Sequence, residues 1–508
     1  MNLFLFLVGG TGSRVLKPLI MQFAAGVRPT DQQTGLPIKD LQVVPIIMDP
    51  HRANEDLKRT DDLLRWYKEI RQSLYGEQIE VERGFFNVKI ATLSDLVPQH
   101  GLSDTFIFNL GSIAEKEFKD YISFDTLNDG NQALCSMLFS QEHLNTKMDI
   151  GFVGSPNIGS VALNQFKNSV EFREFANVYK KEDKVFIVSS IFGGTGAAGF
   201  PIIVKNIRDA AYNPNLTNRG DLRDAKIGAL TVLPYFNVAS DEKSPITRSD
   251  FVIKTKSALY YYQENLTGPK SLSLNACYYL GDEEQSVPYP NDPGGDGQRN
   301  DAHFIEMIGA SAILDFLSIP DDKLRSADGK AMNPIFREYG LKHDENMLTL
   351  MSFGQKTRDL MNQCMVKFHL LFMYVTHSFL QDIGRGYTLD KPEIKSSFAS
   401  TSFYRTLTNQ FFHSYYEWLM EMQNNNRSFA PFNIMSLKLD NCIVGVMPKK
   451  SFFSGTIDYK TILAAMNAQS KKALSQSLYG ENQAPLKLMD LFDQVADKII
   501  AEKYNSIK

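Results

Sequence analysis

The chain has 508 residues, 43% of them apolar and 22% charged, values that favour about two or three globular domains and exclude a disordered or fibrous protein. Its net charge of −4, from 54 basic and 58 acidic residues, gives no overall basic surface for nucleic acid or an anionic membrane. The four cysteines are far apart and form no CxxC pair, which disfavours a disulfide framework or a cysteine-rich zinc site and favours a reducing cytoplasm.

The N-terminal segment predicts a strand, a glycine turn and a helix. The apolar run LFLFLV (3–8) ends in GGTGS and is followed by residues with helical spacing; it has no basic region typical of a targeting signal. A second buried strand, VVPIIMD, ends at Asp49. This order predicts a parallel, right-handed crossover in an open α/β sheet, with a ligand site at the carboxyl ends of the strands.

The following segments repeat this pattern up to residue 317. We expect helices at 60–75 and about 103–145, with a short strand at 86–92 between them. The loop segment 148–160 is followed by a helix to about 180, and then by a strand, a glycine loop and a helix over 184–210. Two more strands are expected at 227–236 and 276–282, and a buried helix at 301–317.

The C-terminal part begins with an irregular polar stretch at 318–350. Beyond it we expect a long helix within 351–385, an aromatic-rich segment at 403–424, a strand at 441–448 and an amphipathic helix at about 486–505. The apolar stretch 366–380 contains charged residues and is too short for a membrane span. His369 and His377 lack a third ligand at helical spacing, so we interpret them as packed side chains and predict no metal site there.

Three glycine loops carry the functional prediction, because glycine turns before helices let backbone N–H groups approach an anion such as phosphate. They are Gly9-Gly10-Thr11-Gly12-Ser13, Gly154 to Gly159, and Gly193-Gly194-Thr195-Gly196-Ala197. A P-loop is excluded, because no Lys-Ser or Lys-Thr follows at the required offset.

A dinucleotide fingerprint fits the first loop in part. Val15 stands where its third glycine would be, and Asp49 lies 37 residues after Gly12, whereas the fingerprint has its acidic residue about 20 residues on. Asp49 suits either a ribose contact or the cap of a helix at 52–57. Asn157 suits either phosphate binding or side-chain bonds that hold the loop.

Taken together, the three loops resemble those of the tubulin and FtsZ superfamily. FGGTGAAGFPIIVKNIRD (192–209) is similar to the signature loop GGGTGTG or GGGTGSG, SPNIGSVA to the FtsZ loop ANPExG, ALTVLPYF (229–236) to the FtsZ strand with VVTxPF, and LVGGTGS to the first phosphate loop. The resemblance covers residues 1–317 in patches and points to prokaryotic tubulin-like proteins that are neither FtsZ nor tubulin.

This resemblance implies an α/β fold with a tubulin/FtsZ-like parallel-sheet domain at 1–300, a helical insertion at about 50–147, a central helix at 301–317, and a smaller α+β C-terminal domain with a helical end at 318–508. It implies GTP or GDP, with Mg²⁺ carried on the phosphates. The nucleotide would be bound by Gly9, Gly10, Thr11, Gly12, Ser13, Asp49, Gly154, Asn157, Gly159, Gly193, Gly194, Thr195, Gly196 and Ala197, with Asn300 and His303 near the base.

The sequence departs from the superfamily at its catalytic loop. No NxDxxD or NxDxxE follows residue 317, and Ala197 replaces a Thr or Ser of the signature loop. A second alignment makes residues 301–306 this loop, with Glu306 as the carboxylate that orients water, but then leaves no central helix. Hydrolysis is therefore less well supported than binding.

The function we expect is that of a cytoplasmic, prokaryotic tubulin-like protein that binds guanine nucleotide, assembles head to tail into filaments and hydrolyses GTP weakly, if at all. One alternative is a GTP-binding scaffold without turnover in a prokaryotic stress or anti-phage system, in which the helical insertion and the C-terminal region recruit other proteins. The other is a dinucleotide-dependent oxidoreductase that uses the first strand–helix–strand unit.

Overall fold

The computed structural model describes residues 1–50, 54–108, 110, 113, 115–148, 152, 155–235, 248–268, 271–282, 300–326, 331–340, 347–446, 457–475, 478–504 and 507. Residues of the predicted sites that lie outside these ranges include Gly154.

The centre of the molecule is a seven-stranded parallel sheet in the order β3-β2-β1-β4-β5-β6-β7. Its strands are β1 (Asn2–Val8), β2 (Gln42–Met48), β3 (Lys89–Ile90), β4 (Lys184–Ser190), β5 (Lys226–Val232), β6 (Ala276–Gly281) and β7 (Ile335–Gly340). All seven residues of β2, β4 and β5 are buried, because helices cover both faces of the sheet. The predicted α/β fold class is confirmed.

The strand order changes direction between β1 and β4. The strands β2 and β3 extend the sheet on one side of β1, and β4 to β7 extend it on the other. Val8 at the end of β1 pairs with Ser189 at the end of β4. In open parallel sheets, such a switch point opens a crevice at the carboxyl ends of the strands, where ligands bind.

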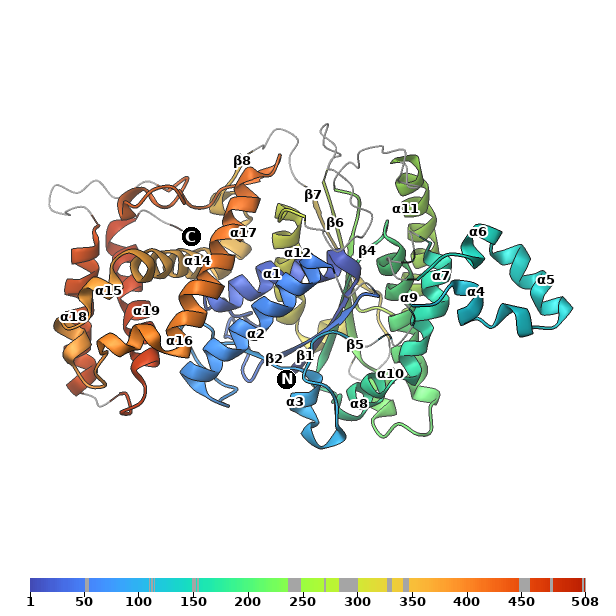
Figure 1. Ribbon diagram of the computed structural model, residues 1–508, viewed down its shortest axis with the longest axis horizontal. Coiled ribbons are helices and arrows are strands. Elements are labelled where there is room, and N and C mark those ends of the chain that lie inside the picture. Colours follow the sequence, from blue (N-terminus) through green and yellow to red (C-terminus); the bar gives the residue numbers. More distant parts are fainter. Residues whose placement is uncertain are drawn as a thin grey trace.

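Helices form a layer on each face of the sheet (Figure 1). One layer contains α1 (Gly9–Ala24), α2 (Glu55–Tyr75) and α12 (Phe304–Ser318), and the other contains α7 (Pro156–Leu163), α8 (Val170–Val178), α9 (Gly194–Asp209), α10 (Arg219–Arg223) and α11 (Arg248–Tyr262). The buried helix expected at 301–317 is α12. Gly309 lets α12 approach α1, since a Cβ there would lie 3.0 Å from a methyl group of Val15.

The segment predicted as a helical insertion, 50–147, contributes to the sheet as well as to the periphery. Its residues Lys89–Ile90 form β3, and Ile107 makes a parallel bridge to Ile47 of β2. Of the segment expected to be helical at about 103–145, the described residues form the short helices α4 (Phe118–Tyr121), α5 (Asp129–Leu138) and α6 (Gln141–Leu144). These three project from one end of the molecule as an arm (Figure 1).

The C-terminal part is mainly helical and lies at the opposite end of the molecule from the arm (Figure 1). Its elements are β8 (Met347–Leu348), α14 (Gln355–His377), α15 (Phe379–Asp382), α16 (Ser402–Arg405), α17 (Phe412–Asn424), β9 (Ser428–Phe429), α18 (Tyr459–Ser475) and α19 (Ala484–Lys503). The short helix α13 (Asp321–Leu324) lies at the main sheet instead, where Asp321 pairs with Lys226 of β5. The helices expected within 351–385 and at about 486–505 are α14 and α19. None of the described helices is long and apolar enough to span a membrane.

Two local expectations for this part are corrected. In the described part of 441–448, Ile443 makes a single bridge to Phe432 and no strand forms, because Gly445 adopts a positive φ of 78° that breaks an extended chain. His369 is buried and stacks on Phe432 with 4.0 Å between ring centroids, as expected of a packed side chain, whereas His377 is exposed.

A buried lysine joins the sheet to the end of α12 and predicts a dependence of stability on pH. Lys184 Nζ donates to the carbonyl oxygens of Leu317 and Ile319, and burial lowers the pKa of Lys184 to about 8. Between about pH 8 and 10 the unfolded chain holds the proton more tightly, so this residue's contribution to the unfolding free energy rises with pH, by at most about 1.4 kcal/mol per pH unit.

Urea unfolding of wild type and Lys184→Met at pH 7.5 to 9.5 tests this expectation. The wild-type midpoint is expected to rise more steeply with pH than that of the variant. Parallel pH profiles would contradict the assignment.

Candidate functional site

The first and third glycine loops meet at the switch point of the sheet. Each follows the carboxyl end of a strand, the first after β1 and the third after β4. A Cβ placed on Gly9 would lie 3.4 Å from Cβ of Thr195 and 3.5 Å from the backbone nitrogen of Gly196. The N-termini of α1 and α9 are therefore in direct contact.

The three glycines of the first loop differ in their surroundings. Gly9 has a φ of +74°, which favours glycine in the turn. A Cβ on Gly12 would lie 2.8 Å from the carbonyl carbon of Leu7 and 2.9 Å from the carbonyl oxygen of Val188, so Gly12 allows α1 to pack closely on the strands. Gly10 faces open space, with no atom of the described residues beyond its own helix and chain neighbours within 4 Å of such a Cβ. Gly10 is thus where a ligand can approach the backbone.

The remaining residues of this loop have smaller roles that the structure defines. Ser13 is buried, and its hydroxyl donates to the carbonyl oxygen of Gly10 over 2.8 Å. This bond lies inside the first turns of α1. Thr11 is only partly buried.

The third loop is packed tightly on β4. A Cβ on Gly196 would lie 2.6 Å from the carbonyl oxygen of Ser190, and Gly193 is the N-cap of α9. Thr195 and Ala197 are buried. The hydroxyl of Tyr262 in α11 donates to the carbonyl oxygen of Ala197 over 3.2 Å, a contact for which the sequence offers no signal.

The second loop meets the third through its helix, α7. Gly159 lies in α7, where a Cβ would be 2.8 Å from Cβ of Ala198 and 3.1 Å from the carbonyl oxygen of Gly194. Asn157 is exposed in the first turn of α7. The structure thus brings the described parts of all three loops together.

The helices that begin at these loops have the same N-terminal chemistry, which α14 and α19 also have, but only these three begin at the predicted loops. In α1, α7 and α9 no side chain caps the first turn, and none of the three has an acidic residue there. By contrast, Asn54 caps α2 and Ser169 caps α8. Uncapped N–H groups and the positive end of each helix dipole favour an anion at this place.

Asp49 directly follows β2 and is buried. Within the described residues the next helix, α2, begins at Glu55, and the side chain of Asn54 accepts from its first turn. A cap by Asp49 of a helix at 52–57 falls partly on residues outside the described ranges and stays a prediction. A ribose contact of Asp49 stays a prediction. Asn300 donates three hydrogen bonds to the carboxylate of Asp56 in α2.

His303 is the N-cap of α12 and is almost completely buried. Its Nδ1 accepts a hydrogen bond from the N–H of Ile305 over 3.0 Å, and burial lowers the pKa of His303 to about 3. The neutral ring therefore has its proton on Nε2. This Nε2–H has no hydrogen-bond partner among the described residues.

A cluster of buried charges lies beside the first loop and was missed by the sequence analysis. Arg14 of α1 pairs with Glu306 of α12 at 2.5 Å, and Lys17 of α1 lies 3.8 Å from Glu421 of α17. Glu421 also pairs closely with Arg59 of α2 and accepts from the N–H of Ala302 over 3.1 Å. The sequence signal that could have indicated this cluster is the presence of charged residues inside otherwise apolar helices.

This ion cluster links the first loop to α2, α12 and the C-terminal α17. Burial alone would lower the pKa of Arg14, but the carboxylate of Glu306 raises that pKa above its ordinary value. Burial lowers the pKa of Lys17, and Glu421 opposes that shift. Both cations thus depend on carboxylates from other helices.

The position of Glu306 does not fit the catalytic role predicted for it. Glu306 lies in the first turn of α12, its side chain is 2% exposed, and it faces Arg14 of its own subunit. A carboxylate that acts in a neighbour's site must reach the surface. The structure therefore corrects the prediction that Glu306 orients water for a neighbouring subunit.

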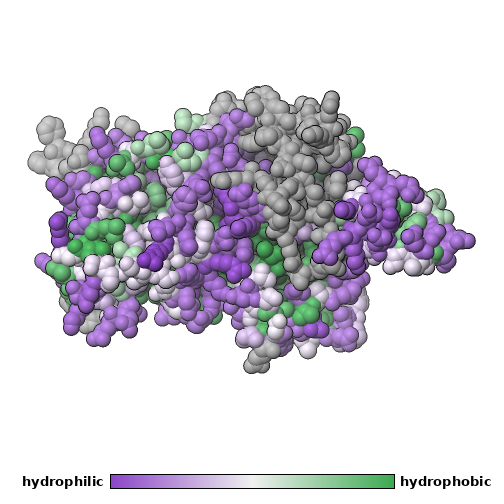
Figure 2. Space-filling model, in the orientation of Figure 1, coloured by the Kyte–Doolittle hydropathy of each residue, from purple (hydrophilic) through white to green (hydrophobic). Residues whose placement is uncertain are grey.

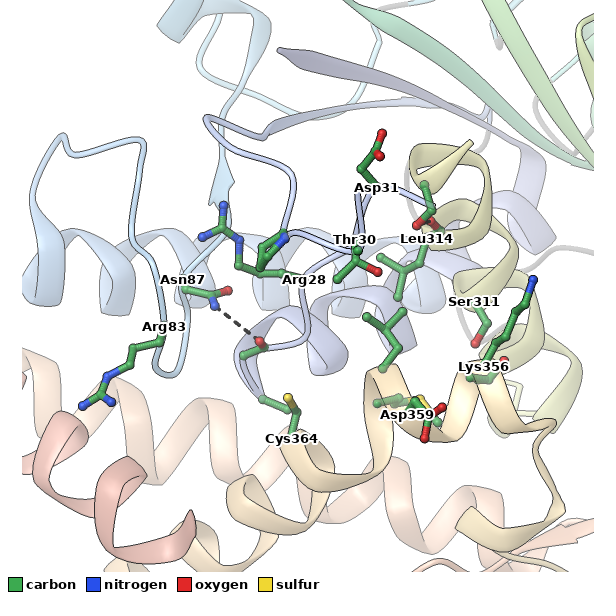
Figure 3. A pocket seen from close by; sticks show the side chains of 18 of the residues that line it. Arg28, Thr30, Asp31, Arg83, Asn87, Ser311, Leu314, Lys356, Asp359 and Cys364 are labelled. Atoms are coloured by element: carbon green, nitrogen blue, oxygen red, sulfur yellow. Dashed lines mark hydrogen bonds between the residues drawn. The ribbon is translucent and has the colours of Figure 1, made fainter. Parts of the chain in front are cut away.

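A cavity of about 650 Å³ lies at the far end of α1 from these loops, next to Ala25 and Gly26. It lies between the N-terminal region and α14, and both cations and anions line it, among them Arg28, Asp31, Lys356 and Asp359 (Figure 3). None of the predicted nucleotide-binding residues lines it.

Among the comparisons with known proteins, similarity is found only with solved structures. No protein-family model matches the chain, and no curated protein matches it. Among solved structures, CetZ2 from Haloferax volcanii, in a GTPγS-bound protofilament, is similar with 14% sequence identity and a TM-score of 0.27. The match covers 65% of this chain and 60% of that one, so this chain spans less than two thirds of that protein. At this TM-score the likeness carries no argument about function.

Proposed function

We propose that this protein binds a guanine nucleotide, GTP or GDP, with the phosphates at the three glycine loops. The observation that carries the proposal is the meeting of uncapped helix N-termini at the switch point of a parallel sheet, with Gly10 open to a ligand. Backbone N–H groups of α1 and α9 would donate to the phosphate oxygens, and Mg²⁺ would be bound through the phosphates.

The preference for guanine is proposed from His303 and from the resemblance of the loops to the tubulin and FtsZ superfamily. The buried Nε2–H of His303 is a donor without a partner among the described residues. It suits a carbonyl oxygen, which guanine has and adenine lacks. On the sequence resemblance, we also propose that the protein associates head to tail, hydrolyses GTP weakly and is cytoplasmic. The same resemblance supports the proposed domain division at 1–300, 301–317 and 318–508.

A dinucleotide-dependent oxidoreductase is the second candidate. The strand order 3-2-1-4-5-6 within this sheet is also that of dinucleotide-binding folds, and Asp49 follows β2, as their ribose-binding acidic residue does. Against it, Val15 occupies the place of the third glycine and packs on α12.

Gly10→Ala tests the binding site without disturbing the fold. The new methyl group meets no atom of another element in the described part of the chain, so we expect the unfolding free energy to stay the same or rise slightly, since Ala favours a helix. We expect the affinity for GTP, measured by calorimetry, to fall at least about tenfold, because the methyl group occupies the space through which phosphate reaches the backbone.

Gly220→Ala is the matched control, because a Cβ at Gly220 in α10 also meets nothing within 4 Å. It should leave GTP affinity unchanged. If Gly10→Ala binds GTP as well as this control does, the phosphates do not lie at the first loop.

A further inference from the structure

The arm at residues 117–148 is a small folded unit of its own. Glu117 and Lys147 form an antiparallel bridge at its base, where the N–H of Phe118 donates to the carbonyl oxygen of Thr146 over 2.9 Å. Phe118 is fully buried, and its ring centroid lies 4.8 Å from that of Phe139. The arm therefore has a fixed base and a core that holds its helices.

The helix α5 presents an uncovered apolar ridge on this arm. No residue of α5 is buried. Leu134, Met137 and Leu138 lie at i, i+3 and i+4, hence on one face of the helix, and are 54%, 85% and 60% exposed. Figure 2 shows hydrophobic side chains on the projecting arm. Grouped apolar side chains of this size favour an interaction site.

Negative charges frame this ridge. Between Lys119 and Lys147 the chain has four carboxylates and no Lys or Arg. They are the exposed residues Asp120, Asp125, Asp129 and Glu142. An anionic membrane surface would repel this frame, whereas a helix with apolar and basic side chains would complement it.

The helix α11 of the same chain has that complementary character. Ile253, Tyr260 and Tyr261 follow a spacing of seven and eight residues, lie on one face, and are 63%, 68% and 50% exposed. From Val252 to Tyr262 the helix has two lysines, Lys254 and Lys256, and no carboxylate. Its inner side is anchored, because the buried ring of Tyr262 lies 4.9 Å from that of Phe200 in α9.

We propose that α5 of one copy of this chain packs on α11 of a second copy, and that the reciprocal contact makes a two-fold dimer. Within one subunit both ridges are uncovered, so they do not pack on each other. Both helices lie toward the end of the molecule from which the arm projects (Figure 1). With a two-fold axis at that end, α5 of each copy would pack on α11 of the other, so that the same contact is made twice. Each contact would bury the six apolar side chains of the two ridges, next to the carboxylates of the arm and the lysines of α11.

Sedimentation velocity of the full chain tests this dimer. We expect a dimer at about 50 µM protein without added GTP, and added GTP should not dissociate it, since the interface contains none of the predicted nucleotide-binding residues. Met137→Asp and Ile253→Asp are each expected to raise the dimer dissociation constant at least about tenfold, because either places a charge in the apolar contact. Tyr212→Asp, at a residue that is also 85% exposed but lies on neither ridge, is the control.

A charge reversal separates this contact from other modes of association. Lys254→Glu with Lys256→Glu should weaken the dimer, and adding Asp125→Lys with Asp129→Lys should restore it. A wild-type chain that stays monomeric at this concentration, or a dimer that neither Met137→Asp nor Ile253→Asp weakens, would overturn the proposal. Nucleotide content measured on the same samples reports on the proposed function independently.

Discussion

Replacing Glu421 with glutamine is expected to lower the free energy of unfolding by about 3–5 kcal/mol, the range found when one partner of a buried ion pair is removed. Glu421 is 8% exposed and is the carboxylate next to Arg59 and Lys17. With glutamine there, the buried Lys17 and the half-buried Arg59 lose their nearest negative charge, and the pKa of Lys17 is already lowered by its burial. Urea unfolding followed by circular dichroism measures the loss.

Glu417→Gln is the matched control for this prediction. Glu417 lies one turn earlier in α17, its side chain is 36% exposed, and its partner His413 is at the surface. We expect a change of about 0–1 kcal/mol there. Adding Lys17→Met to Glu421→Gln should recover part of the loss, because it removes one uncompensated charge. A loss for Glu421→Gln as small as that of the control would show that the ion cluster does not hold α17 to the N-terminal region.

Gly12→Ala is expected to destabilise the protein by about 3 kcal/mol or more, at the upper end of what overpacking costs in a core. The added Cβ would lie within 3 Å of backbone atoms of Leu7 and Val188, which belong to the two central strands. Backbone atoms in paired strands cannot move aside as a side chain can. The gain in helix propensity from Gly to Ala, at most about 1 kcal/mol, offsets only part of this.

The comparison with Gly10→Ala gives this prediction its control, because the two substitutions are identical and lie two residues apart. Gly12→Ala should lower the thermal midpoint, and Gly10→Ala should not. If both variants unfold like the wild type, α1 does not pack on the sheet as closely as described. The two variants thus distinguish a glycine that is needed for packing, Gly12, from one that is needed for the approach of a ligand, Gly10.

Much of the sheet could be predicted because its strands are continuous apolar runs that end in glycine or aspartate. The segments LFLFLV and KVFIVSS could only be buried strands, and parallel strands connected by helices place their following loops at one edge. The close approach of the first and third loops follows from the adjacency of β1 and β4, which sequence order alone does not give.

Three features of the structure could not be predicted from the sequence. The segment 103–145 was expected to be helical, but periodicity does not show that the chain turns back between short helices at residues such as Ser123, which has a positive φ. The strand β7 joins the main sheet from within a stretch that looked irregular and polar. The ion cluster combines charges from four helices, and a single sequence does not show which distant charges meet.

Whether the three loops hold a guanine nucleotide is tested most directly by denaturing freshly purified protein and identifying the released nucleotide by chromatography. We expect GTP or GDP in near-stoichiometric amount, because a tightly bound ligand survives purification. Release of NAD or a flavin would contradict this expectation, as would an empty protein that also fails to bind added GTP.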